Sequence, residues 1–423
     1  MGIENIKTNT MTDLEILSGL YDEGVFTEIC PELGSLGEKA GAFASFGKVS
    51  DMNVYAFVQR GEKDSGSMSV VGANKLLKLY SMALHTGYPI VGFYRTSAGK
   101  IAEGNMLLDA VGELLSFSTQ LSGVVPQISV LLGDCISSTA LLASSADFIV
   151  KARGTAFSIS DCGCSGEGKA SILVDNDVQA LEAVKSILSY VPANNLSLAP
   201  VAFDVTEEAA VDFDSAFDSR QKLLLFEKTM KDAEISLNRL MGATVGVVKT
   251  IGEMLEAKTA TRIASFVRFC DAFSIPVITA VDCEGFKCLS STKTLLSAYA
   301  EATTPKISVV TGKACGISYM TLAGRGAGVD VVIGIEGAVV SPASAEATAY
   351  ILLGDKLKEG TVAEQDKMIK DFIATELSVT TAARQGFIDA VCDYSVLRGI
   401  LVNYLDVLSA KRVETMPKKH STI

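Results

Sequence analysis

Histidine is nearly absent from this chain, with 2 among its 423 residues. His85 stands two residues before Gly87 at the end of a helical pattern, so we expect it to cap the last turn, and His420 lies in the C-terminal tail. Neither is near a nucleophile motif, which argues against a Ser-His-Asp or Cys-His mechanism. An enzyme of this sequence has to work mainly without a histidine base.

Long apolar runs and metal-ligand patterns are also missing. No run reaches the roughly 18 apolar residues of a membrane-spanning helix, and the opening MGIENIKTNTMTDLEI lacks the apolar core of a signal peptide. The chain has 9 cysteines, of which only Cys162 and Cys164 lie close together, with no second ligand set at zinc spacing. We therefore expect free thiols, a cytoplasmic location and no bound metal.

A basic stripe is missing as well. The net charge is −12 and no Lys/Arg-rich segment interrupts it, so we expect no nucleic-acid partner, although the local field of a pocket can still attract a small anion. Hydrophobic residues make up 48% of the chain and charged residues 20%, which is ample for buried cores. The length predicts two domains.

Five blocks of the chain recur in the same order, which predicts an internal duplication. The clearest pair is VPQISVLLGDCISSTALLA from Val125 and TPKISVVTGKACGISYMTLA from Thr304, an offset of 179 residues. The other pairs are NKLLKLYSMALHTG with TRIASFVRFCDAFS, PIVGFY with PVITAV, ADFIV with VDVVIG, and GTAFSIS with GAVVSPAS.

Each repeat alternates short apolar strands with amphipathic helices, which predicts an α/β fold. The runs 128–132 and 307–310 are apolar on both faces, as is typical of strands covered on both sides. The stretch 191–219 is rich in Pro, Asn and acidic residues. It is predicted to be a linker between an N-terminal domain, 1–190, and a C-terminal domain, 220–423.

Turns of small residues follow predicted strands at two places in each half. One pair comprises residues 94–104 and 281–286, and the other comprises 133–140 and 312–319. Small residues between a strand and a helix let backbone N–H groups point into a cavity, where they can stabilise a carbonyl oxygen that gains negative charge. The alternative is that they only allow tight strand–helix packing.

Six stretches spread over nearly the whole chain carry a family resemblance. They are LYDEGVFTEI (20–29), SGVVPQISVLLG (122–133), LSYVPANN (188–195), FVRFCDAFSIPV (266–277), AYAEATTPKISVVTGKA (298–314) and KRVETMPKKH (411–420). In these stretches and their order the chain resembles the biotin-dependent acyl-CoA carboxyltransferases of the propionyl-CoA carboxylase β and methylmalonyl-CoA decarboxylase α type.

This resemblance implies two crotonase-like ββα superhelix domains, in agreement with the duplication. It implies an enzyme that moves a carboxyl group between carboxybiotin, on a carrier protein, and the α-carbon of an acyl-CoA. The implied cofactor is biotin, coenzyme A is part of the substrate, and no metal takes part. The implied partners are a biotin carboxyl carrier protein and biotin carboxylase or decarboxylase subunits. The family forms homo-oligomers, from dimer to hexamer, with sites between the N-half of one subunit and the C-half of its neighbour.

The resemblance also implies two oxyanion holes made of backbone amides. The first, for the thioester enolate, falls on Ser97 and Ala98. The second, for the biotin carbonyl, falls on Ile317 and Ser318, with Gly316 on the same biotin side. In the family the biotin ring is thought to take the α-proton itself, which agrees with a site short of histidine.

Charged residues near these turns are further candidates. Arg95 and Lys100, with Gly99 between them, are placed to bind the phosphates of CoA, and the alternative is that they are solvated. Asp282 and Glu284 follow a predicted strand in the second half. They are candidates for acid–base chemistry, and the alternative is a turn or cap role.

Around the expected pocket the chain departs from the family. Met320 replaces a frequently acidic position linked to acyl-group choice, so the acyl group is not predicted. The other departures are Arg95 for Asp, Ser97-Ala98 for two glycines, Ser137-Ser138 for Gly-Gly, Ile317-Ser318 for Gly-Ala, and a shorter loop at 287–292. Two alternatives therefore stay open: a catalytically degenerate structural or regulatory partner, and a biotin-independent, CoA-binding enzyme of the crotonase fold.

Overall fold

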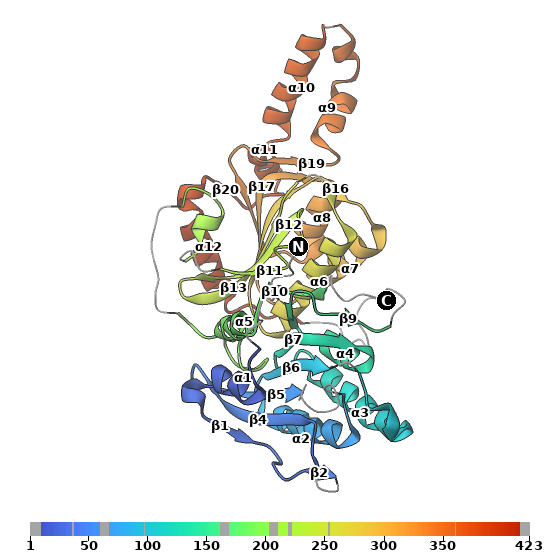
Figure 1. Cartoon of the computed structure of the whole chain (residues 1–423). Helices are drawn as coiled ribbons and strands as arrows, with labels where there is room; N and C mark the ends of the chain where they lie inside the picture. The colour runs from blue at the N-terminus through green and yellow to red at the C-terminus, as the bar shows by residue number, and fades with distance from the viewer. Residues whose placement is uncertain are drawn as a thin grey trace, which may run out of the picture. The chain divides into compact units, whose positions relative to one another are not determined.

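Two eight-stranded sheets of the same topology dominate the protein (Figure 1). The computed structural model describes residues 10–35, 38–59, 67–96, 98–160, 169–202, 210–218, 222–252, 254–359 and 361–414. The chain divides into two compact units, Met1–Pro200 and Val201–Ile423, with one of these sheets in each.

The sheet of the first unit has the order β1-β4-β5-β6-β7-β8-β10, and β9 also pairs with β7. Its strands are β1 (Phe26–Glu28), β4 (Ala42–Val49), β5 (Met52–Gln59), β6 (Ile90–Thr96), β7 (Gln127–Ile136), β8 (Phe148–Ala152), β9 (Phe157–Ser158) and β10 (Ile172–Val174). A small hairpin, β2 (Gly34–Ser35) with β3 (Glu38–Lys39), lies outside this sheet.

The sheet of the second unit has the order β11-β12-β13-β15-β17-β18-β20, and β19 also pairs with β17. Its strands are β11 (Leu223–Leu225), β12 (Ala233–Leu240), β13 (Ala243–Thr250), β15 (Val277–Cys283), β17 (Lys306–Cys315), β18 (Val331–Ile335), β19 (Val339–Ser341) and β20 (Ala390–Cys392). A short parallel pair, β14 (Met254–Leu255) with β16 (Gly285–Phe286), lies beside it.

The two sheets correspond strand for strand. In each, the first three strands are antiparallel and all later pairs are parallel. The apolar stretches of β7 and β17 are buried throughout their first five residues, as predicted for strands covered on both faces. The predicted duplication and the α/β class are therefore confirmed.

Helices cover both faces of the first sheet. Tyr55 and Phe57 of β5 lie in the core that includes Leu76, whereas Tyr21 bonds Ser45, whose side chain points to the opposite face. The helices α2 and α3 therefore pack on one face, and α1 with α5 on the other. The helices are α1 (Asp13–Leu20), α2 (Val70–Thr86), α3 (Asn105–Leu121), α4 (Ser137–Ser144) and α5 (Asp177–Tyr190).

The predicted end of α2 has the expected cap. Gly87 has φ 70°, the left-handed conformation that terminates helices, and its N–H donates to the Ala83 carbonyl at 2.8 Å. The His85 Nδ1 lies 2.6 Å from the Ser81 carbonyl oxygen in the same turn. His85 therefore contacts its own helix one turn earlier than the cap predicted for it, and His420 lies outside the described residues.

The second unit repeats this layering. Leu397 and Leu401 of α12 are fully buried against β12, β13, β15, β17 and β18, while Gly246 of β13 allows Phe266 and Cys270 of α6 to approach the other face. The helices are α6 (Ala257–Ala272), α7 (Leu289–Glu301), α8 (Ile317–Leu322), α9 (Ala345–Leu353), α10 (Val362–Glu376), α11 (Val379–Arg384) and α12 (Tyr394–Leu408). In Figure 1, α9 and α10 form a hairpin that projects from this unit around a small apolar cluster of its own.

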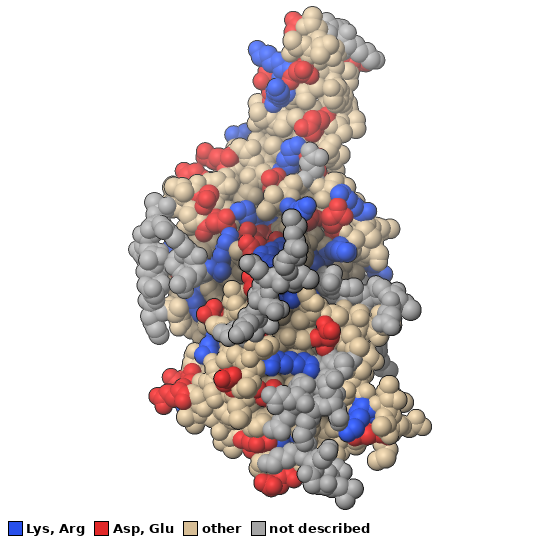
Figure 2. Space-filling view, in the orientation of Figure 1, with Lys and Arg blue, Asp and Glu red and all other residues tan. Residues whose placement is uncertain are grey.

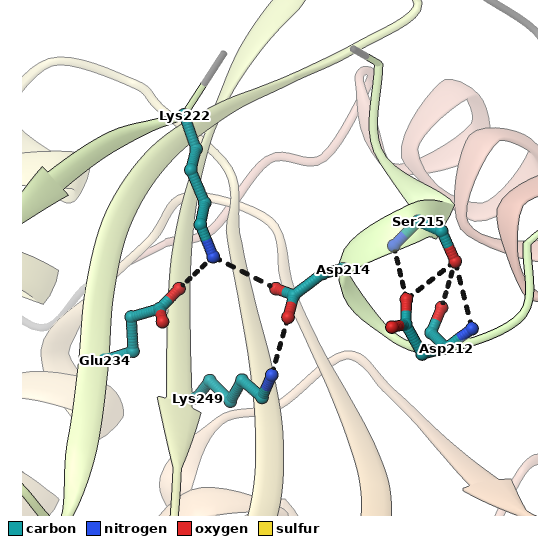
Figure 3. Close-up of polar contacts among 6 residues, drawn as sticks. All are labelled: Asp212, Asp214, Ser215, Lys222, Glu234 and Lys249. Atoms are coloured by element: carbon teal, nitrogen blue, oxygen red, sulfur yellow. Dashed lines mark hydrogen bonds and ion pairs between the residues drawn. The ribbon is translucent and has the colours of Figure 1, made fainter. Parts of the chain in front are cut away.

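The described parts of the predicted linker, 191–219, are packed rather than free. Val191 is buried and belongs to the first unit, whereas Phe213 and Phe217 lie in the core of the second. Figure 3 shows the contacts that hold the part around Asp214. The Asp214 carboxylate lies between the ammonium groups of Lys222 and Lys249, at 3.5 and 2.6 Å. The segment thus ends in an ion-paired anchor on the sheet.

A second carboxylate completes this anchor (Figure 3). Glu234 of β12 lies 2.6 Å from the Lys222 ammonium. Burial lowers the pKa of Lys222, but the hydrogen bonds and charges of Glu234 and Asp214 together raise it above its ordinary value. In the same segment the Ser215 hydroxyl and N–H both bond the Asp212 carboxylate, at 2.7 and 2.8 Å, which lowers the pKa of Asp212.

Charges of both signs are intermixed on the face shown in Figure 2. Within the described ranges, no extended area of that face carries basic side chains alone. None of the described helices is long and apolar enough to cross a bilayer.

Candidate active site

Bulges of the same kind interrupt both sheets where two of the predicted turns begin. The register between β6 and β7 shifts across Arg95, and the register between β15 and β17 shifts across Asp282. The extra residues lie on β7 in the first sheet and on β17 in the second. Each of these bulges contains a glycine that lies against the residue opposite, Gly133 against Arg95 and Gly312 against Asp282. A bulge bends the pairing and redirects the following residues. Both halves therefore turn the chain out of the sheet at corresponding places.

The predicted turn at 94–104, called the first turn below, is held by the backbone of Met68. Its N–H donates to the Ala98 carbonyl and its carbonyl accepts from the Lys100 N–H, both at 2.8 Å, and Met68 forms a parallel bridge with Gly99. Three of the predicted residues, Ala98, Gly99 and Lys100, are thus brought together in one fixed turn. Ser97 lies outside the described residues.

Arg95 is bound within its own unit. Its Nη2 pairs with the Asp177 carboxylate, and its Nη1 donates to the Met11 carbonyl at 2.7 Å. The Met11 N–H donates in turn to Asp177 Oδ2 at 2.9 Å. The side chains of Arg95 and Asp177 are only 16% and 8% exposed. With both Nη atoms bonded inside the unit, the guanidinium cannot present two N–H groups side by side to a phosphate. This favours a structural role of Arg95 over the predicted contact with CoA.

The predicted turn at 312–319, called the second turn below, centres on Gly316. It has φ 51° and ψ −116°, a conformation that residues with a side chain adopt only under strain. Its N–H donates to the Ser341 carbonyl at 2.8 Å, and a Cβ at this position would lie 3.0 Å from the Pro342 carbonyl oxygen. Ile317 is the first residue of α8, so its N–H is among those that a helix leaves without an intrahelical partner.

The Ser318 hydroxyl ties α8 to two strands. It accepts from the Cys315 N–H at 2.9 Å and lies 2.5 Å from the Cys283 carbonyl oxygen and 2.8 Å from the Cys315 carbonyl oxygen. The side chain is fully buried. The hydroxyl is hydrogen-bonded to backbone groups of β15 and β17, so any contact of Ser318 with a ligand depends on its backbone N–H.

Two apolar side chains of α8 lie on the surface beside this turn. Ile317 is 58% exposed and Met320 is 59% exposed. Neither side chain fills the interior below the turn. Met320, the position predicted to bear on the choice of acyl group, is thus exposed in the single chain.

Sequence reasoning missed a charged cluster at the second turn. Lys313 of β17 pairs with Glu284 and lies 3.6 Å from Glu346 of α9. The hydrogen bond to Glu284 is the main cause that raises the pKa of Lys313. Asp282 accepts from the Lys313 N–H at 2.9 Å. Both acidic residues that were candidates for acid–base chemistry therefore have internal partners, which favours the alternative of a turn role.

Ser137 occupies the place in the first half that Gly316 occupies in the second, at the same offset of 179 residues. Its φ is 60° although it is not glycine, and its side chain is exposed. A side chain in this region costs about 1–2 kcal/mol relative to a right-handed conformation.

Ser137→Gly is accordingly expected to raise the free energy of unfolding by roughly 0.5–1 kcal/mol, after allowing for the greater freedom of glycine in the unfolded chain. Urea titration of the purified protein measures this. Ser144→Gly in the same helix, where the backbone is helical, is the control and should be destabilising. A loss of stability in both variants would contradict the strain at Ser137.

No group of three or more His, Cys, Asp or Glu side chains placed to hold a metal ion occurs in the part of the chain that the structure describes. Cys162 and Cys164 lie outside that part. Each unit by itself thus has a candidate turn at a strand end, with Lys100 beside the turn of the first unit and Lys313 with its carboxylates beside the turn of the second.

Comparisons with known proteins agree with this arrangement. A family model described as the carboxyl transferase domain matches residues 5–160 and 231–423. The propionyl-CoA carboxylase beta chain of Saccharopolyspora erythraea is 28% identical over 97% of this chain and 90% of the relative. The methylmalonyl-CoA decarboxylase subunit alpha of Veillonella parvula is 28% identical over 98% of this chain and 93% of the relative.

The fold has a close counterpart among solved structures. Transcarboxylase 12S, determined with hydrolyzed methylmalonyl-coenzyme A bound, superposes with a TM-score of 0.90 at 24% identity, over 98% of this chain and 92% of that chain. Together with the two matching sheets, this likeness confirms the predicted pair of crotonase-like domains. The family resemblance predicted from the six sequence stretches is confirmed as well.

Proposed function

Since the chain belongs to the carboxyl transferase domain family, we propose that it moves a carboxyl group between carboxybiotin, carried on a partner protein, and the α-carbon of an acyl-CoA. The observation that supports this most is that the family match spans both halves, each of which ends a bulged central strand pair in a turn of backbone donors. The relatives named for propionyl-CoA and methylmalonyl-CoA chemistry support the substrate class.

We assign to each turn a different oxygen atom whose developing negative charge it stabilises. The N–H groups of Ser97 and Ala98 would donate to the thioester oxygen as the enolate forms, and those of Ile317 and Ser318 to the ureido oxygen of biotin. In support of this assignment, Gly316 has φ 51° and ψ −116° directly before α8, so the first N–H groups of that helix follow a residue without a side chain. Carboxybiotin supplies the carboxyl group, and the chain supplies orientation and preorganised donors.

The remaining site residues take binding roles in this proposal. Gly99 and Lys100 would lie along the CoA moiety, with the Lys100 ammonium meeting phosphate. Gly316 would line the biotin side, and Met320 would contact the acyl group. The exposed thioether of Met320 does not define which acyl group is bound.

Partners and assembly follow from the same function. We propose a biotin carboxyl carrier protein and a biotin carboxylase or decarboxylase subunit as partners, in the cytoplasm. We propose a homo-oligomer, dimer to hexamer, because two turns from different halves have to face each other. Transcarboxylase 12S, which has the same fold, is a hexamer assembly. A strictly monomeric species in light scattering at micromolar concentration would argue against this.

The test is a decarboxylation assay with purified protein, free biotin, and malonyl-CoA or methylmalonyl-CoA. Carbon dioxide release that depends on biotin supports the proposal. Thioester turnover without biotin would instead indicate a CoA-binding crotonase-fold enzyme. Complete inactivity of folded protein against a panel of acyl-CoAs would indicate a degenerate structural partner, an alternative favoured by the strained Ser137 in place of a family glycine.

A further inference from the structure

We propose that Met11, Arg95 and Asp177 form a lock that positions the first turn for carboxyl transfer, with Arg95 as a positioning residue. The inference rests on the proposed function and adds to it a residue whose side chain acts through the backbone of the turn. It also gives the segment before α1 a role in the site.

The lock joins three segments that are distant in sequence. Arg95 lies 82 residues from Asp177 and 84 from Met11, and each of the three contacts the other two. Arg95 stands on β6, Asp177 is the first residue of α5, and Met11 precedes α1. A carboxylate in the first turn of a helix is itself favoured by the helix dipole, so Asp177 is a well-placed anchor for a cation.

The position of Arg95 connects the lock to the turn. The residue lies at the register shift between β6 and β7, two residues before Ser97 and three before Ala98. Its side chain leaves the strand end for the helix layer, where it is held at two points. Arg95 is the residue of β6 that stands opposite the bulge of β7. Holding it by its side chain, where the regular pairing is interrupted, fixes the direction in which the chain leaves the sheet, and therefore where the amides of the turn point.

The second unit supports this interpretation because Asp282, the residue opposite the bulge of β17, is also anchored. Asp282 there accepts from the Lys313 N–H at 2.9 Å, and its own N–H donates to the Thr250 hydroxyl at 2.8 Å. Arg95 and Asp282 have opposite charges, yet both are held by groups outside their own strand. The two halves therefore share an anchored residue opposite the bulge, although the anchoring contacts differ.

The chain also provides a matched control for the lock. Arg398 pairs through Nη2 with Asp218 and donates through Nη1 to the Ala216 carbonyl at 3.0 Å. The side chains of Arg398 and Asp218 are 13% and 2% exposed, so this contact resembles the lock in partners and burial. It lies near Met241 in the β12–β13 hairpin, at the end of the sheet opposite to the bulge at Asp282.

The first experiment compares Arg95→Gln with Arg398→Gln in the full chain. Both are expected to lower thermal stability, because each leaves a buried aspartate without its cation. Only Arg95→Gln is expected to lower kcat, by about 10- to 100-fold with KM within about twofold, since displacing a positioned donor weakens the transition state more than substrate binding. Equal kcat values in the two variants would overturn the proposal.

A charge exchange tests the pair directly. Arg95→Asp should lower kcat at least as much as Arg95→Gln, because it places two carboxylates together. Adding Asp177→Arg should recover at least about tenfold of that loss by restoring an ion pair in reverse. A double variant no more active than the single one overturns the pairing as the cause.

Hydrogen exchange gives a readout that does not depend on catalysis. The Lys100 N–H is bonded to Met68 in the intact turn, so its exchange reports on the order of the turn. We expect exchange in a peptide spanning residues 98–100 to be at least about tenfold faster in Arg95→Gln and unchanged in Arg398→Gln. Unchanged exchange in Arg95→Gln overturns the lock even if the wild-type chain transfers carboxyl groups. If the wild-type chain proves inactive but Arg95→Gln exchanges faster than wild type, the lock is supported and only the proposed function is contradicted.

Discussion

Gly316→Ala is expected to lower kcat for carboxyl transfer by on the order of 100-fold. The added Cβ would lie 3.0 Å from the Pro342 carbonyl oxygen, which is backbone and cannot move aside as a flexible side chain would. The turn has to shift instead, and the N–H groups at the start of α8 shift with it. Displacing preorganised donors by a fraction of an ångström to 1 Å is enough to cost about two orders of magnitude.

The control for this variant is Gly354→Ala. Gly354 has φ 47° and ψ −116°, nearly the same backbone conformation as Gly316 with φ 51° and ψ −116°. A Cβ at Gly354 would meet nothing within 4 Å, and the residue lies at the end of α9, in the projecting hairpin. Both variants therefore carry the same backbone strain, but only Gly316→Ala moves the proposed site.

Steady-state kinetics with free biotin and methylmalonyl-CoA, together with thermal unfolding, distinguish the outcomes. We expect each variant to lose about 1–2 kcal/mol of stability from the shared backbone strain, with a further loss in Gly316→Ala from the contact with the Pro342 carbonyl. A loss of kcat is expected in Gly316→Ala alone. If Gly316→Ala kept the kcat of Gly354→Ala, the amides at the start of α8 would have no part in the reaction.

Lys306→Gln is expected to remove a pH dependence of stability of up to about 3 kcal/mol. The Lys306 side chain is 2% exposed, and its ammonium donates to the carbonyls of Tyr299 and Ala302, at 2.5 and 2.6 Å, at the end of α7. Burial is the main cause that lowers the pKa of Lys306 from 10.5 to about 8, and the nearby Lys411 charge adds to it.

The sign of the effect follows from proton binding. Between about pH 8 and 10.5 the folded chain has released the Lys306 proton while the unfolded chain still holds it. The unfolded state then binds more protons, so the free energy of unfolding rises with pH across this window. At about 1.4 kcal/mol for each pH unit, the limit for one group is about 3 kcal/mol.

Glutamine is the matched replacement because the first half already has it. Gln127 stands at the position equivalent to Lys306, and its Nε2 donates to the Ser118 carbonyl at 3.0 Å. The Gln127 N–H bonds Asp147 as the Lys306 N–H bonds Asp330, both at 2.8 Å. Glutamine can thus occupy this position in the fold without a titrating group.

Urea unfolding at pH 7.5, 8.5, 9.5 and 10.5 measures the prediction. The difference in free energy of unfolding between wild type and Lys306→Gln should widen in favour of wild type as the pH rises. Lys228→Gln, at an exposed lysine, corrects for general effects of losing a positive charge. Parallel curves for wild type and Lys306→Gln would show that Lys306 does not titrate in this window.

The repeated blocks were enough to predict the fold. Two copies of a strand, a small-residue turn and a helix at an offset of 179 residues require two similar sheets, since the same hydrophobic pattern buries the same faces. The structure adds that the correspondence includes the register shifts at Arg95 and Asp282. A register shift depends on how two strands meet, which the pattern within one strand does not encode.

The candidate turns could be predicted, but their supports could not. Ser318 reads as an ordinary polar residue, yet its hydroxyl links backbone groups of Cys283 and Cys315. Arg95 reads as a phosphate ligand because its partners are more than 80 residues away in sequence. Local spacing identifies which residues follow a strand, whereas long-range pairing decides whether their charges are available.

The opposite charges of Arg95 and Asp282, the residues opposite the two bulges, have an evolutionary consequence. One ancestral strand end became two, and each copy acquired a separate set of neighbours to keep it in place. A substitution that alters the contacts of Arg95 leaves those of Asp282 unchanged, and the reverse also holds, so the two strand ends can diverge in sequence independently.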